Sequence, residues 1–88
     1  MANDLFGARE IKIYPNPTRG DLNIQIQNGE KDEKYQYLLF DLNGRLLMEF
    51  SHSGNGTVPL NLHSFYTGTY ILVIRTSDGD LKYKIMKE

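Results

Sequence analysis

Short turn-forming segments recur along this chain and divide it into small pieces. They are Pro15-Asn16-Pro17, Asn28-Gly29, Asn43-Gly44, Gly54-Asn55-Gly56, Thr67-Gly68 and Asp78-Gly79. The stretches between them hold about five to nine residues rich in Ile, Leu, Tyr and Val, which is too short for ordinary helices. This spacing predicts an all-β protein.

Alternation of apolar and polar residues then places the strands. Residues 21–27 alternate without a break, with Leu22, Ile24 and Ile26 on one face, as a sheet with one solvated face requires. The other expected strands are Glu10–Tyr14, Tyr35–Asp41, Arg45–Phe50, Thr57–Leu62, Gly68–Thr76 and Leu81–Met86. Pro59 favours an edge position or an irregular strand, because proline lacks an amide hydrogen.

The connections carry their own signals. Asn43-Gly44 suits a type I′ turn, so the strands on either side of it are expected to form a hairpin. Residues 28–34 are polar and densely charged, which predicts a solvated loop. The short link His63–Tyr66 is expected to form a single helical turn.

About seven short antiparallel strands without an amphipathic helix predict a two-layer β-sandwich, with a small closed barrel as the alternative. A chain of 88 residues fits one such core. Residues 1–9 offer little apolar surface to offset the entropy of ordering, so we expect a flexible N-terminal lead or linker before a domain of residues 10–88.

Composition argues against several classes of function. A formal net charge of −1 gives no electropositive surface for nucleic acid. The longest apolar run is Tyr70–Ile74, whereas a membrane-spanning helix needs roughly 20 residues, so no membrane span is expected. The N-terminus has neither the basic start nor the apolar stretch of a signal peptide.

No pattern for chemistry stands out. The chain has no cysteine, and His52 and His63 lack the spacing of a shared metal site. Asp41-Leu42-Asn43-Gly44 resembles only the start of a calcium loop, and phosphate-binding or nucleophile motifs are missing from the sequence. We therefore expect no catalytic residue, no cofactor and no metal, and an enzyme is the least favoured class.

Three sequence blocks, taken in order, indicate a family. The first holds Pro15, Asn16, Pro17 and Gly20, the second Asp41, Gly44 and Arg45, and the third Gly68 and Tyr70, followed by a basic last strand with Lys84 and Lys87. They resemble the Pro-Asn-Pro-x-x-Gly, aromatic-Asp-x-x-Gly-Arg and Gly-x-Tyr blocks of the type A C-terminal sorting domains of the type IX (Por) secretion system. The resemblance covers residues 10–88.

The resemblance implies an immunoglobulin-like β-sandwich that acts as a C-terminal secretion signal in Bacteroidetes-type bacteria. The implied partners are an upstream cargo fused to the domain, the outer-membrane translocon, its shuttle protein and a sortase-like peptidase that removes the domain. The implied route runs through the periplasm to the cell surface or the extracellular space. The matching residues listed above are then the signal motif.

Other interpretations stay open at this point. Backbone geometry alone explains the prolines and glycines, and core packing explains Tyr70, so the blocks can act through the fold instead of by contact. Lys82 and Lys84 suit an edge strand protected against aggregation, and an exposed last edge suits the addition of another strand. The rival functions are an accessory immunoglobulin- or fibronectin-like domain that binds carbohydrate or protein or acts as a spacer, and a retained docking domain of the secretion machinery.

Overall fold

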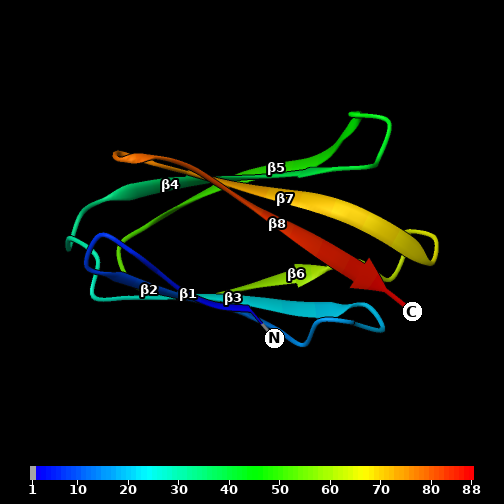
Figure 1. Cartoon of the computed structure of the whole chain (residues 1–88), viewed down its shortest axis with the longest axis horizontal. Helices are drawn as coiled ribbons and strands as arrows, with labels where there is room; N and C mark the ends of the chain where they lie inside the picture. The colour runs from blue at the N-terminus through cyan, green and yellow to red at the C-terminus, as the bar shows by residue number, and fades with distance from the viewer. Residues whose placement is uncertain (1) are drawn as a thin grey trace.

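The computed structural model describes residues 2–88, with side chains from Leu5 onward, and within them it contains eight strands and no helix. The strands are β1 (Ala2–Phe6), β2 (Arg9–Tyr14), β3 (Asp21–Gln27), β4 (Lys34–Phe40), β5 (Leu46–Ser53), β6 (Gly56–Asn61), β7 (Gly68–Thr76) and β8 (Gly79–Lys87). They form two antiparallel sheets, in the orders β1-β2-β3-β6 and β5-β4-β7-β8, which lie one above the other in Figure 1. The predicted all-β sandwich is confirmed.

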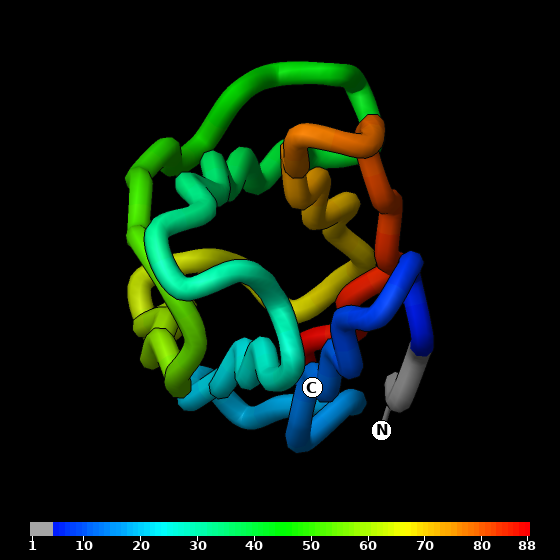
Figure 2. The backbone as a smooth tube through the Cα atoms, turned by 90° about the vertical axis from the view of Figure 1, so that its left-hand side faces the viewer, coloured from blue at the N-terminus to red at the C-terminus, as the bar shows by residue number. Residues whose placement is uncertain are grey.

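The core lies between the two sheets, where the alternating apolar residues of each strand meet. The fully buried side chains are Ile11, Ile13, Leu22, Ile24, Ile26, Tyr35, Tyr37, Leu39, Leu62, Leu72, Ile74 and Ile85. Figure 2 shows the β5–β6 connection crossing between the layers on one side, while β8 lies on the other. The end strands β1 and β8 are edge strands of their sheets. Each sheet therefore has a terminal strand of the chain at one edge.

Strands with the clearest patterns lie where the sequence predicts them. The bounds of β3 and β7 agree with the predicted ranges, and β7 is central in its sheet. β6 contains Pro59 and forms an edge, as its proline indicates. Periodicity was sufficient to place these strands, because burial of one face fixes the register of each strand.

Residues 1–9 contain more structure than the sequence indicates. Ala2–Phe6 form β1 and pair with β2 from Ala2↔Ile13 to Phe6↔Arg9. Leu5 is 71% exposed, whereas Phe6 is half-buried and packs against the core, so main-chain pairing and the Phe6 contact both hold this strand at the sheet edge. Met1 lies outside the described residues, and a linker role for residues 1–9 stays a prediction.

Two connections differ from the expectation. A type I′ turn needs positive φ at both central residues, but of Asn43 and Gly44 only Gly44 has it, at 82°. The hairpin forms through a longer loop in which the Asp41 carboxylate accepts bonds from the amides of Asn43 and Arg45, each at 2.9 Å. The expected helical turn at 63–66 is a hydrogen-bonded turn from Leu62 to Phe65.

Candidate functional site

The three sequence blocks meet at one end of the sandwich, which we call the motif end. At the right of Figure 1, the β2–β3 turn, the β4–β5 turn, the start of β7 and the C-terminus lie together. The register explains this arrangement, because Phe40 pairs with Ile71 and Gly68 pairs with Lys87. Segments far apart in the sequence thus build one surface.

The side chain of Asn16 joins the first block to the last strand. Its amide nitrogen donates to the Lys84 carbonyl at 2.8 Å, and its oxygen accepts from the Met86 amide at 2.9 Å. Thr18 continues the pairing: its amide donates to the Met86 carbonyl and its carbonyl accepts from the Glu88 amide, each at 2.8 Å. We call these four bonds the latch. It covers the edge of β8 from Lys84 to Lys87 and continues to Glu88, so the last edge is only partly open, contrary to the expectation of an exposed one.

Thr18 and Gly20 shape the turn that carries the latch. The Thr18 side chain is buried, donates to the Asp21 carbonyl at 2.5 Å and accepts from the Gly20 amide at 3.0 Å. Gly20 has a φ of 150°, and a Cβ at this position would collide with the His63 ring. Both observations explain why glycine stands at this position of the turn. Pro15 and Pro17 flank the latch and are exposed, and the peptide bonds that precede them are cis.

The two lysines of the last strand have different surroundings. The Lys87 ammonium group donates to the carbonyls of His63, at 3.2 Å, and Phe65. It ties the end of β8 to the loop before β7. The side chain of Lys84 is exposed, and it is the Lys84 carbonyl that the latch uses.

The second and third blocks meet beside Tyr66. A shallow pocket of about 240 Å³ lies between the β4–β5 turn and the loop before β7, and its lining includes Asp41, Arg45, Tyr66 and Tyr70. The Tyr70 hydroxyl donates to the Tyr66 carbonyl, and Tyr70 itself is buried. Arg45 lies 3.6 Å from the Asp41 carboxylate and its side chain is 80% exposed. Gly68 has a φ of 156°, a backbone conformation that favours glycine at this position.

A model of the secretion system C-terminal sorting domain family matches residues 12–88, which include all three blocks and the latch. The chain belongs to this family. No curated protein matches it.

The domain is a C-terminal sorting signal for type IX secretion. Membership implies export to the cell surface or the extracellular space, contact with the secretion system and fusion to an upstream cargo. The family is not a catalytic one, and no finding favours the accessory binding domain over the sorting signal. Across residues 2–88, the sorting domain has no helix long and apolar enough to span a bilayer.

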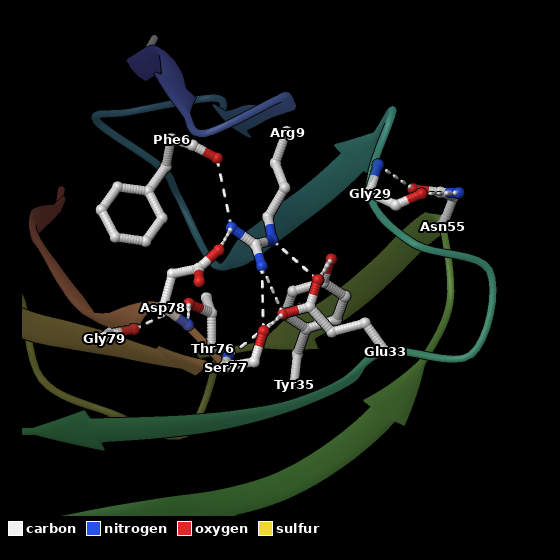
Figure 3. Close-up of polar contacts among 10 residues, drawn as sticks. All are labelled: Phe6, Arg9, Gly29, Glu33, Tyr35, Asn55, Thr76, Ser77, Asp78 and Gly79. Carbon is white, nitrogen blue, oxygen red and sulfur yellow. Dashed lines mark hydrogen bonds and ion pairs between the residues drawn. The ribbon is translucent and has the colours of Figure 1, made fainter.

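At the other end of the sorting domain lies a buried ion pair that the sequence did not indicate. Arg9 lies on β2 and Glu33 directly precedes β4. The Arg9 guanidinium donates two hydrogen bonds to the Glu33 carboxylate, with nitrogen–oxygen distances of 2.7 and 2.6 Å (Figure 3). Ser77 donates to the same carboxylate from its amide and its hydroxyl, Tyr35 donates at 2.8 Å, and Asp78 lies 2.9 Å from Arg9. We call these five residues the Arg9 cluster. It joins the two sheets.

Burial makes this cluster electrostatically strong. The side chains of Arg9 and Glu33 are 6% and 5% exposed. The hydrogen bonds from Arg9 lower the pKa of Glu33 to about 2, and burial opposes that change only partly. The same contact raises the pKa of Arg9. The prediction of a solvated loop at 28–34 is therefore wrong for Glu33, because its partners Arg9 and Ser77 lie 24 and 44 positions away, too far in sequence to be recognised.

Proposed function

We propose that the secretion machinery reads the motif end as one folded surface, and that the signal residues divide into two groups. The exposed members, Pro15, Pro17, Arg45 and Lys84, touch the machinery. The members that make internal contacts or fix the backbone give that surface its shape, and they are Asn16, Gly20, Asp41, Gly44, Gly68, Tyr70 and Lys87. The observation that carries this proposal is the latch, because it makes the exposed terminal strand depend on the first block.

The proposed partners follow the export route. The outer-membrane shuttle protein and the translocon meet the domain in the periplasm, and a sortase-like peptidase then separates it from its cargo. In this role the domain is a substrate of the machinery and uses no catalytic residue, cofactor or metal of its own. Its net charge of −1 and the exposed Arg45 and Lys84 favour local charge contacts over a general electrostatic attraction.

A reporter fusion tests this proposal. The chain is placed behind a signal peptide and a periplasmic reporter in a type IX-competent bacterium, and reporter activity is measured in the periplasm and outside the cell. Arg45→Ala and Lys84→Ala together should lower export severalfold while leaving the thermal transition unchanged, because both side chains are exposed. Lys31→Ala, in an exposed loop at the other end, is the matched control.

The outcomes test the export function separately from the contact role of the exposed residues. A wild-type fusion that stays in the periplasm would contradict the export function itself. Normal export of the Arg45 and Lys84 double variant would contradict the proposed contact of these two side chains with the machinery. Deletion of residues 84–88 is a poorer test, because it also removes Ile85 from the core. Mass spectrometry of the exported protein then distinguishes a removed domain from a retained docking domain.

A further inference from the structure

The part of β8 that the latch leaves uncovered is an open sheet edge. β8 is the last strand in the order β5-β4-β7-β8, so within residues 2–88 one of its sides has no neighbouring strand in that sheet. The bonds of the latch begin at the Lys84 carbonyl and continue toward Glu88. We call residues 80–84, on the other side of that point, the open edge; they lie in the upper layer of Figure 1.

The latch also shows which backbone groups of β8 face outward. It uses the carbonyl of Lys84 and both peptide groups of Met86, so the even-numbered residues turn away from β7. Outward and inward groups alternate along a strand in an antiparallel ladder. The amide and carbonyl of Lys82 and the amide of Lys84 therefore face outward, whereas Tyr83 and Ile85 direct their peptide groups toward β7.

The side chains of the open edge differ on its two faces. Lys82 and Lys84 are exposed on the outer face, and among the side chains that the structure describes neither lies within ion-pair distance of a carboxylate. Leu81 and Tyr83 are half-buried on the inner face. A strand added here would place one face of its side chains beside two cations and the other beside apolar groups.

We propose that the open edge binds an extended segment of a partner protein in which acidic and apolar residues alternate. Main-chain hydrogen bonds to Lys82 and Lys84 supply the affinity, and the two faces of the edge select the sequence. A second copy is a poorer occupant, because its own β8 would bring two further lysines to the edge. Placing the partner in the export machinery rests on the proposed function, but the binding can be measured without export, so the two fail separately.

Amide hydrogen exchange on the full 88-residue chain tests this inference. In the free protein the Lys82 amide should exchange quickly and the Ile85 amide slowly. The probe is a blocked eight-residue peptide that alternates Glu and Val, and its control has the same composition with all Glu residues first. The alternating peptide should slow exchange at Lys82 and Lys84, and the control peptide should not.

Two variants locate the interaction. Lys82→Glu with Lys84→Glu should weaken binding about fivefold or more, since each opposite-charge pair across strands becomes a repulsive one. Lys31→Glu with Lys34→Glu makes the same change in net charge at the start of β4 and in the loop before it. Because β7 lies between β4 and β8, this variant should leave the dissociation constant within about twofold. Lys82→Pro should fold, because its amide faces away from β7, and should lose the peptide.

Three results would overturn the inference. The first is unchanged exchange at Lys82 and Lys84 while the peptide binds. The second is protection of those amides that grows with protein concentration alone, which would make a second copy the occupant. The third is lysine-dependent binding to phosphatidylglycerol vesicles with no response to the peptide, which would assign the two lysines to a lipid surface.

Discussion

Replacing Glu33 by Gln should cost the domain about 3 kcal/mol of unfolding free energy at neutral pH. The change keeps the size of the side chain but removes the charge that Arg9 contacts at 2.6 Å. Arg9 keeps its ion pair with Asp78, whose side chain is 65% exposed. Part of the Arg9 charge therefore stays compensated in the variant. Breaking a buried ion pair typically costs about 3–5 kcal/mol, so we expect the lower part of that range.

The pKa of Glu33 leads to a similar value. A fall from 4.5 to about 2 corresponds to about 3 kcal/mol, because each pH unit is worth about 1.36 kcal/mol. Since the folded-state pKa is the lower one, this stabilisation is complete above pH 4.5 and is lost as pH falls toward 2. The wild type and Glu33→Gln should therefore differ in stability at pH 7 and converge near pH 2.

Urea unfolding between pH 7 and pH 2 measures this difference, with Glu30→Gln in the same loop as an exposed control. In thermal unfolding the expected loss corresponds to about 12 °C or more. Arg9→Met combined with Glu33→Met should cost less than Glu33→Gln, because no buried charge is left alone. A Glu33→Gln variant within about 1 kcal/mol of the wild type at pH 7, or a difference that is the same at pH 7 and pH 2, would refute the reasoning.

Three further substitutions test other parts of the fold. Asn16→Ala should cost about 1–2 kcal/mol through its two lost hydrogen bonds, and the Met86 amide should exchange faster; unchanged exchange would mean that the latch is not formed in solution. Gly20→Ala should cost about 1–2 kcal/mol in thermal unfolding because of its backbone angle, and full recovery on adding His63→Ala would show that the ring alone is responsible. Tyr37→Phe should stabilise by about 1 kcal/mol, because the buried Tyr37 hydroxyl has no hydrogen-bond partner among the described residues; a loss of stability in urea would reveal one.

Local sequence patterns predicted most of the strands because each strand buries one face. β3 and β7 follow from alternation and from an apolar run, which are visible within a few residues. β1 does not follow in this way, since it pairs at the sheet edge with Leu5 exposed and only Phe6 packed against the core among the side chains described for it. The prediction of a type I′ turn at Asn43-Gly44 was wrong, because the Asp41 carboxylate organises a longer loop there.

The family blocks located the motif end, but the sequence could not assign a task to each residue. Asn16 and Met86 are separated by 70 positions, and Glu33 and Ser77 by 44. Such contacts leave no periodic trace in the sequence. The sequence alone therefore could not tell that Asn16 pairs with a backbone, or that one glutamate of a charged loop is buried.

The latch has a consequence for biosynthesis. Its two halves are made at different times, since Asn16 is translated 68 positions before Lys84 and the segment from Lys84 to Glu88 follows at the end of the domain. A polypeptide that is released prematurely lacks the second half and cannot form the latch. Under the proposed function such a polypeptide presents an incomplete motif end, and the secretion machinery thereby selects cargo translated to its final strand.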